Sequence, residues 1–415
     1  MAKAQIPHGY KQTEVGVVPE DWEVKSVHEI ATIKTGPFGT LLKASEYSEG
    51  DGVPLISVGE IREGFLKITD QTPRVPDGVI RRLPQYVLKK GDIVFGRKGA
   101  VERSALIRQQ QEGWFLGSDG ISVRPSKDYY GEYLALQFQS ARVKGWLVQN
   151  AIGTTMPSLN QEILRNVVVP LPPTKAEQEA IAEALSDADA LIESLEQLIA
   201  KKGRLKQGAM QELLRPKAGW IATKPGRLGA FLKGSGIRKD EALSGDLPCV
   251  RYGEIYTKHS DYIKAFYSWI SPTVAATARR LKSGDVLFAG SGETKEEIGK
   301  CVAFVDDIEA YAGGDIVIPR PEKENSMFLG YYLNTAPINR QKASKGQGDA
   351  VVHISSAALA DIDLTIPSIE EQTAIAAILT DMDAEIAALK EKLAKARQIK
   401  QGMMQELLTG RIRLV

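Results

Sequence analysis

The sequence predicts an α+β protein in which two mixed α/β domains are joined by two long helices that form an antiparallel coiled coil, with a pseudo-twofold internal repeat. Three observations lead to this prediction. The 415 residues are too many for a single ordinary core. Two 40-residue stretches have helical periodicity and resemble each other, and the segments before them share short matching islands.

Composition narrows the class of protein first. The hydrophobic content of 43% and charged content of 25% are typical of a globular protein. We find neither an apolar run long enough to span a membrane nor a secretory signal in MAKAQIPHGYKQ. Cys249 and Cys301 are the only cysteines, so a reducing cytoplasm is the expected location. A formal charge of +1 neither indicates nor excludes a polyanionic partner.

The strongest signal is the repeat of a helical segment. When Glu177–Pro216 is placed over Glu371–Gly410, about 21 of 40 positions are identical without a gap. Both copies contain KQG followed by MQELL after one residue. Two unrelated charged helices would not share such a run, so the chain contains a duplicated unit.

The repeat continues in short islands between the helices. VPLISVGEI matches LPCVRYGEI, GDIVFGRKG matches GDVLFAGSG, and GSDGISVRP resembles GGDIVIPRP. One scaffold therefore carries two different surfaces. The expected order is an N-terminal segment (1–21), a first variable domain (22–173), a first helical region (174–216), a second variable domain (217–367), and a second helical region with a tail (368–415).

Each helical segment has the periodicity of a coiled coil. The stretch Glu177–Leu214 contains no proline and is flanked by Pro173 and Pro216. Apolar residues recur four and three apart for about three heptads. The predicted seam residues are Ile181, Leu185, Ala188, Ile192, Leu195 and Ile199 in the first helix, and Ile375, Leu379, Met382, Ile386, Leu389 and Leu393 in the second.

Charge favours an antiparallel arrangement of the two helices. Each helix begins with acidic residues and ends with basic residues, so antiparallel packing sets acid against base at both ends. The same gradient complements the dipole of each helix, which explains part of it without any pairing. We expect a pair within one chain, with a pair between two chains as the alternative.

The variable domains are expected to be mainly β. Short strand-like runs such as VPLISV and GDIVFG in the first domain, and DVLFAG and DIVIP in the second, are separated by turn residues. A helical segment lies late in each domain, at 131–148 and 326–339. Both domains are therefore predicted to be mixed sheets with a few helices.

Basic residues cluster near glycine-rich loops at matching places of both domains. Any one cluster is usually a solvated face, but the matched positions favour nucleic-acid binding. Glycine lets a backbone approach phosphate, Arg and Lys bind guanine edges, and Gln binds adenine edges. The candidate contacts are Lys34, Thr35, Phe38, Arg62, Arg97, Lys98 and Arg103 in the first domain, and Lys233, Ser235, Arg238, Lys239, Arg251, Tyr252, Ser291, Lys295, Lys345 and Gln347 in the second.

Motifs for catalysis and metal binding are not found in the sequence. There is no HExxH, no Walker loop and no paired His/Cys spacing, and the four histidines are isolated. GDVLFAGSGE (284–293) is similar to the glycine loop of a methyltransferase. Its repeat partner lacks the second glycine spacing, so we interpret it as a turn that ends a strand. No catalytic residue and no metal ligand is predicted.

With this layout in place, the chain resembles the specificity subunits of type I restriction–modification systems. The resemblance rests on GYKQTEVGVVPEDWEV (9–24), LPPTKAEQEAIAEAL (171–185), IPSIEEQTAIAAIL (366–379) and MQELLTGRIRLV (404–415). It implies two target-recognition domains on double-stranded DNA, two conserved helical regions, two bound modification subunits, and restriction subunits that join through them.

The resemblance also implies a division of chemistry. S-adenosylmethionine, ATP and magnesium would belong to the partner subunits, and this chain would bind no cofactor and would not be an enzyme itself. The implied role is phage defence through recognition of a bipartite, asymmetric DNA site. Two alternatives from other classes remain: a stand-alone DNA methyltransferase or nuclease, and a coiled-coil adaptor that does not bind DNA.

Overall fold

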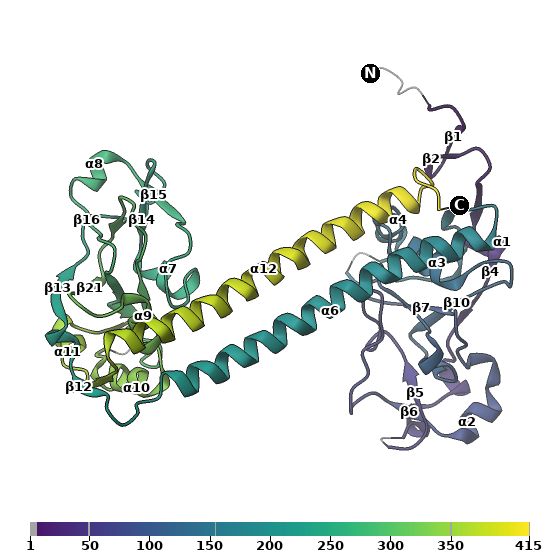
Figure 1. Ribbon diagram of the computed structural model, residues 1–415. Helices are drawn as coiled ribbons and strands as arrows, with labels where there is room; N and C mark the ends of the chain where they lie inside the picture. The colour runs from purple at the N-terminus through teal and green to yellow at the C-terminus, as the bar shows by residue number, and fades with distance from the viewer. Residues whose placement is uncertain (1–5, 49, 154, 349–350, 415) are drawn as a thin grey trace. The chain divides into compact units, whose positions relative to one another are not determined.

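The computed structural model of the chain describes residues 6–48, 50–153, 155–348 and 351–414. The chain divides into two compact units (Figure 1). Unit 1 comprises Met1–Glu196 and Lys392–Val415, and unit 2 comprises Gln197–Glu391. Each unit therefore contains one variable domain together with part of both long helices.

Unit 1 is built on a four-stranded antiparallel sheet of order β4-β10-β7-β8. Every residue of β7 is buried, because both faces of the sheet are covered. Phe95 packs edge-to-face on Phe138 of α3, with ring centroids 4.9 Å apart, and Val94 faces a second cluster that contains Ile56. The strands are β4 (Ala31–Thr35), β7 (Ile93–Gly96), β8 (Ser104–Leu106) and β10 (Gly120–Pro125).

A smaller three-stranded sheet of order β6-β5-β9, with β5 and β9 parallel, packs beside the first. Two further strand pairs are β1 with β2 and β3 with β11. The remaining elements of unit 1 are β1 (Tyr10–Thr13), β2 (Gly16–Pro19), β3 (Glu23–Ser26), α1 (Val27–Ile30), β5 (Val53–Ile56), β6 (Arg74–Val75), α2 (Asp77–Arg82), β9 (Phe115–Leu116), α3 (Gly131–Gln139), α4 (Ala141–Asn150), α5 (Gln161–Arg165) and β11 (Val168–Leu171), followed by α6 (Lys175–Leu213), which continues into unit 2.

Unit 2 repeats this topology. Its central sheet has the order β13-β21-β17-β19, and a smaller sheet again contains a parallel pair, β14 with β20. Its elements are β12 (Ile221–Thr223), β13 (Gly229–Lys233), β14 (Leu247–Val250), α7 (Tyr252–Thr257), β15 (Ser268–Ile270), α8 (Pro272–Ala275), β16 (Arg279–Arg280), β17 (Val286–Ala289), β18 (Ser291–Gly292), β19 (Cys301–Ala303), β20 (Tyr311–Ala312), β21 (Ile316–Pro321), α9 (Ser326–Tyr332), α10 (Ala336–Lys345), β22 (Val352–His353), α11 (Ser356–Ala360), β23 (Leu364–Ile366) and α12 (Ile369–Leu407), which continues into unit 1.

A buried ion pair explains two of the shared sequence islands. The Arg124 guanidinium donates two hydrogen bonds, of 2.7 and 2.6 Å, to the carboxylate of Asp92, which is 1% exposed. Arg320 binds the fully buried Asp285 in the same way, at 2.6 and 2.8 Å. These hydrogen bonds raise the pKa of both arginines. In both units, the Asp of the GD island and the Arg of the RP island thus join two neighbouring strands of the central sheet.

A buried glutamine explains the Glu-Gln pair with which both repeated helical segments begin. The side-chain oxygen of Gln178 accepts a hydrogen bond of 2.9 Å from the backbone N–H of Tyr130, at the start of α3. Gln372 binds the N–H of Asn325, at the start of α9, at the same distance. The repeated Glu-Gln dipeptide therefore fixes the beginning of each long helix on the late helix of its domain.

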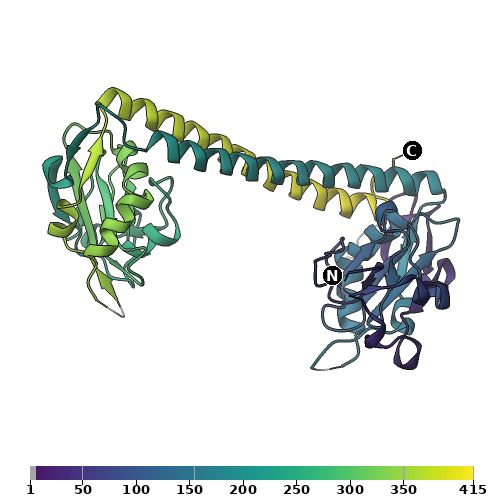
Figure 2. The ribbon, with the colours of Figure 1, turned by 90° about the horizontal axis from the view of Figure 1, so that it is seen from below.

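The long helices pair antiparallel within each unit (Figure 2). In unit 1, Asp189 and Glu196 of α6 pair with Lys400 and Arg397 of α12, each at 2.5 Å. In unit 2, Lys202 of α6 lies 2.6 Å from Glu385 of α12. Residue numbers rise along α6 as they fall along α12, so the antiparallel pairing within one chain that the charge gradient predicts is found in each unit.

The predicted seam residues all turn inward, to different degrees. Ile181 and Leu185 are fully buried in the core of unit 1, and Ile375 and Leu379 lie in the core of unit 2. These four residues therefore attach the helices to the domains as well as to each other. The other eight are half-buried along the helix pair: Ala188, Ile192, Leu195, Ile199, Met382, Ile386, Leu389 and Leu393.

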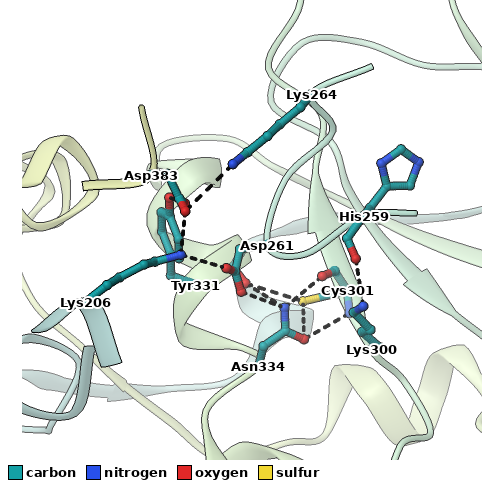
Figure 3. Close-up of polar contacts among 10 residues, drawn as sticks. Lys206, His259, Asp261, Lys264, Lys300, Cys301, Tyr331, Asn334 and Asp383 are labelled. Atoms are coloured by element: carbon teal, nitrogen blue, oxygen red, sulfur yellow. Dashed lines mark hydrogen bonds and ion pairs between the residues drawn. The ribbon is translucent and has the colours of Figure 1, made fainter. Parts of the chain in front are cut away.

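A polar cluster ties the helix pair to the domain of unit 2 (Figure 3). The Lys206 ammonium lies 2.8 Å from Asp383 and 3.6 Å from Asp261, and the Tyr331 hydroxyl donates to Asp383 at 2.7 Å. Although burial favours the neutral acid, the hydrogen bonds from Lys206 and Tyr331 lower the pKa of Asp383. Burial raises the pKa of Asp261. A single lysine thus links both helices to the segment between α7 and β15.

Two expectations about local structure were wrong in detail. The helical segments at 131–148 and 326–339 are each broken into two helices. The break in the first lies at Ser140, whose hydroxyl caps α4, and in the second before Pro337, in the first turn of α10. The GSG segment after β17 is not only a turn, because Ser291 and Gly292 pair with His353 and Val352.

The helix pairing in unit 1 gives the first prediction. Changing Lys400→Glu should lower the free energy of unfolding by about 0.3–1 kcal/mol, because it sets two acids together where Asp189 now pairs with a lysine. Adding Asp189→Lys should restore most of that loss. Thermal unfolding at low salt measures both. Lys395→Glu, at an exposed position of α12, is the matched control, and a double variant no more stable than Lys400→Glu would contradict the pairing.

A buried lysine in unit 2 gives the second prediction. Lys342 is fully buried and donates to the Gly299 carbonyl at 2.7 Å, and burial lowers its pKa to about 8. The unfolded chain therefore holds the proton up to a higher pH than the folded chain. Stability should rise by about 3 kcal/mol in total as the pH increases from about 8 to 10.5. Urea unfolding of parent and Lys342→Met across this range should show a pH-dependent difference, and a constant difference would contradict the burial of the ammonium.

Candidate nucleic-acid interface

The central sheet of unit 1 gathers several predicted basic residues at one end. Thr35 and Phe95 both pair with Ile121, and Phe95 also pairs with Ser104. The loops after β4 and β7 and those before β8 and β10 therefore leave the sheet together, and we call them the sheet end of unit 1. It contains Thr35, Phe38, Arg97, Lys98 and Arg103. Lys34 also lies in β4, but its ammonium donates to the Gln85 carbonyl at 3.3 Å, in the segment that precedes β7.

Two other segments join this sheet end. Ser158 forms an antiparallel bridge with Lys98, and Leu159 donates a backbone hydrogen bond of 2.8 Å to the Arg97 carbonyl. The loop that carries Arg62 is attached through Gly64, whose N–H binds the Ser104 carbonyl at 2.9 Å. The segment before Leu159 was missed from the sequence, because GTTMPSL and its counterpart GDAVVHI share only their first glycine.

The basic side chains at this end form only long, exposed ion pairs. Lys98 lies 3.6 Å from Asp119 and Arg103 lies 4.0 Å from Glu102, all substantially exposed. Among the residues that the structure describes, Arg97 forms no ion pair. Exposed pairs of this kind contribute little to stability, so a phosphate can replace the carboxylate at small cost.

The sequence cluster Arg81–Arg108 is divided by the fold. Lys89 and Lys90 precede β7, whereas Arg97 and Lys98 follow it, so the two groups lie at opposite ends of the same strand. Arg108 follows β8 and therefore lies with Lys89 and Lys90. Only part of a run of basic residues thus faces a common surface, which linear spacing could not show.

Unit 2 has an equivalent sheet end. Lys233 and Phe288 both pair with Val317, and Phe288 also pairs with Cys301, so the corresponding loops leave the sheet together. The Gly290 carbonyl accepts a hydrogen bond of 2.9 Å from Ile354, as Arg97 does from Leu159 in unit 1. The predicted residues Lys233, Ser235, Ser291 and Gln347 belong to this sheet end.

The other predicted residues of unit 2 fall into two groups. Arg251 and Tyr252 begin α7 directly after Val250, whose carbonyl binds Gly313 beside the sheet end, and Tyr252 is 39% exposed. Ser235 donates its hydroxyl to the Thr277 carbonyl at 2.9 Å. The structure leaves three cationic side chains exposed in loops: Arg238, Lys239 and Lys295.

Two predicted residues are less available than expected. Ser291 is only 4% exposed and its hydroxyl lies 2.9 Å from His353 Nδ1, so the expectation of an accessible Ser291 was wrong. Lys345 is paired with Asp361 at 2.8 Å. Hydrogen bonds from Lys224 and Lys345 lower the pKa of Asp361 to about 2. A cross-strand contact accounts for the burial of Ser291, and an ion pair between the ends of α10 and α11 accounts for Lys345.

Two glycines of the basic loops serve the scaffold. A side chain at Gly36 would place its Cβ 1.8 Å from the Gly117 carbonyl oxygen, and one at Gly234 would lie 1.9 Å from that of Gly313. Each glycine is thus required where the chain crosses its own backbone at the sheet end. The close approach of these loops to phosphate stays a prediction.

The repeated glutamate of the GEI islands also holds a turn in place. The Glu60 carboxylate accepts the Ser57 N–H at 3.0 Å, and Glu254 accepts the Arg251 N–H at 3.0 Å. Burial raises the pKa of Glu60. These acids are structural, and they orient the segments that leave the small sheets toward the sheet ends.

Searches for other kinds of site concern the described residues only. In that part of the chain, no group of three or more His, Cys, Asp or Glu is arranged to hold a metal ion. None of the helices described there is both long and apolar enough to cross a membrane. Burial raises the pKa of the Cys301 thiol to about 12, which suits an inert core cysteine.

Comparison with known proteins agrees with this architecture. The family model of the type I restriction modification DNA specificity domain matches residues 19–201 and again 233–398. The type I restriction enzyme MjaVIII specificity subunit of Methanocaldococcus jannaschii is 25% identical over 425 residues, covering 96% of this chain and 94% of that protein.

Two solved structures share the fold. The S subunit of a type I restriction–modification system from M. genitalium has a TM-score of 0.58 at 15% identity, covering 93% of this chain and 96% of that one. A chain from a study of complex assembly and conformational transition of the type I R-M system has a TM-score of 0.52 at 16% identity, covering 95% and 99%. With two matched repeats over most of its length, this chain belongs to the type I restriction–modification DNA specificity family, whose members recognise DNA sequence and are not themselves catalytic.

Proposed function

We propose that each unit reads one half of a bipartite, asymmetric DNA site through its sheet end, and that the chain directs modification and restriction subunits to that site. The observation that carries the proposal is that the two units share their scaffold interactions but differ in the side chains at their sheet ends. The Asp–Arg pair, the glutamine and the crossing glycine are the same in both units, whereas the side chains at the two sheet ends differ.

The differences fall at equivalent positions. Where unit 1 has Arg97 and Lys98, unit 2 has Gly290 and Ser291, and where unit 1 has Ser158, unit 2 has His353. Phosphate contacts need only positive charge, but base edges are read by the individual donor, acceptor or apolar group. Two sheet ends with different groups should therefore specify two different half-sites.

Partners and cofactors form the second part of the proposal. We propose two modification subunits bound to this chain, with restriction subunits joined through them, and S-adenosylmethionine, ATP and magnesium held by those partners. The family supports this, and one structural relative comes from a study of complex assembly in such a system.

Methylation assays separate this proposal from a stand-alone enzyme. With labelled S-adenosylmethionine and target DNA, the isolated chain should transfer no label, and adding the modification subunits should restore transfer. Transfer by the isolated chain would favour the methyltransferase alternative. Salt-independent or absent DNA binding by the assembled complex would favour the adaptor alternative.

The sheet end of unit 1 gives the third prediction. Replacing Arg97 and Lys98 with Ala should weaken DNA binding by the assembled complex. If both contact only phosphate, the slope of log affinity against log salt should fall by about two. If either reads a base, selectivity should relax in one half-site only. Titrations at several salt concentrations measure both effects.

The opposite end of the same strand provides the control. Lys89→Ala with Lys90→Ala removes the same charge from exposed positions that precede β7. This pair should leave the salt slope close to that of the parent. Parental binding by the Arg97 and Lys98 variant at every salt concentration would exclude this loop from the interface.

The fourth prediction concerns modularity. Exchanging Trp22–Pro170 for the same domain of a related subunit should change one half-site and leave the other unchanged. The graft should keep Trp22 and Gln137, because Trp22 packs on Gly410 and Gln137 donates to the Leu408 carbonyl at 2.9 Å. Methylome sequencing of cells that carry the chimera and its modification subunits gives the result. Altered bases in both half-sites would contradict independent reading.

A further inference from the structure

A short turn at the sheet end is closed by the same pair of backbone hydrogen bonds in both units. In unit 1, Ile152 and Ser158 exchange backbone hydrogen bonds of 3.0 and 2.8 Å. In unit 2, Gln347 and His353 do so at 2.9 and 2.8 Å. Each turn follows the second late helix, α4 or α10, and the residue after it, Leu159 or Ile354, is bonded to the sheet end.

Each turn contains a glycine that no other residue can replace without rearrangement. Gly153 has φ of +102° and a Cβ there would lie 2.7 Å from the Met156 carbonyl oxygen. Gly348 has φ of +107° and a Cβ there would lie 2.2 Å from the Val351 carbonyl oxygen. The backbone of Met156 and Val351 is therefore packed on a glycine, which fixes how these residues are presented.

The residue held in this way is apolar and exposed in both units. Met156 is 57% exposed and Val351 is 52% exposed. Single exposed apolar side chains are common on protein surfaces. Here, however, they recur at one equivalent position of two domains whose sheet ends otherwise differ, between the same closing backbone pair and after the same positive-φ glycine. That recurrence points to a common partner with an apolar group.

We propose that Met156 and Val351 are specificity-determining residues that contact the 5-methyl group of thymine, each in its own half-site. The inference rests on the proposed function and adds the chemistry of one base contact to it. The thymine methyl is the apolar feature of the major groove. Insertion between base pairs is the alternative, and methionine can act as such a wedge, but valine, at the equivalent position of unit 2, is too short and narrow for that role.

The first position of each turn adds a difference between the units. Ile152, 59% exposed, occupies it in unit 1, and Gln347, also exposed, occupies it in unit 2. Glutamine can bind both N6 and N7 of adenine, so the Gln347–Val351 pair suits an A·T base pair. The Ile152–Met156 pair offers apolar contact only. We therefore expect the two turns to prefer different base pairs, although both contact the 5-methyl group of a thymine.

Replacing thymine by uracil tests this fifth prediction, because uracil lacks only the 5-methyl group. The chain with its modification subunits is titrated with target duplexes in which each thymine of both strands is replaced in turn. In the parent, at least one replacement per half-site should weaken binding about three- to fivefold, as expected for one buried methyl. Met156→Ala should abolish the penalty in one half-site and Val351→Ala in the other.

Two further variants separate the contact from general effects. Gly153→Ala keeps the Met156 side chain but must displace the turn, so it should abolish the same uracil penalty. Gly113→Ala is its matched control, since Gly113 also has positive φ, at +90°, but has open space where the Cβ would lie. Ile308→Ala, at a 50% exposed position after β19, controls for loss of an exposed apolar side chain.

The outcomes distinguish the inference from the function on which it rests. Half-site-specific binding with uracil penalties that are unchanged in the Met156 and Val351 variants would overturn the inference alone. Parental binding that is insensitive to uracil at every thymine would do the same. A rise in 2-aminopurine fluorescence that depends on Met156 would replace methyl contact with insertion. A parent complex without sequence-specific DNA binding would overturn the proposed function as well.

Discussion

The buried aspartate–arginine pair is the constraint on which each unit depends. Asp92 and Asp285 are almost completely withdrawn from water, and each carboxylate is satisfied by a bidentate guanidinium from the neighbouring strand and by one backbone N–H. Removing one partner of such a pair typically costs about 3–5 kcal/mol, because the other charge stays buried. Both strands are therefore locked in register, and the loops at their opposite ends emerge from a fixed frame.

This arrangement separates stability from recognition. The interactions that the two units share lie in the sheet, at the helix starts and at the glycine crossings. The residues that differ, such as Arg97 and Lys98 of unit 1, lie where strands end. Because exposed side chains contribute little to folding, they can change without disturbing the core. A duplicated scaffold can thus carry two different surfaces, which suits a family whose members recognise DNA sequence.

The sequence was sufficient to predict the elements that leave a repeated or periodic pattern of residues. The 21 identities, the apolar spacing and the charge gradient predicted two domains and an antiparallel helix pair, and the pairs of Lys400 and Lys202 with their acids agree. The residues of the candidate site were harder to predict from the sequence. Whether Lys89 and Arg97 share a face depends on a strand between them, and the burial of Ser291 depends on pairing with His353, 62 residues away. Linear spacing contains neither relation, and the turn that holds Met156 had no motif to mark it.

The position of the turns explains how a reading residue can be both rigid and replaceable. Precise base contact requires a side chain whose backbone does not move, and such rigidity usually comes from burial. Here it comes from a glycine packed beneath the turn and from backbone hydrogen bonds, neither of which involves the reading side chain. Substitution of that side chain therefore leaves its presentation intact. A base preference can change at this position without a compensating change in the core, and that is the property a DNA specificity subunit needs when its target diverges.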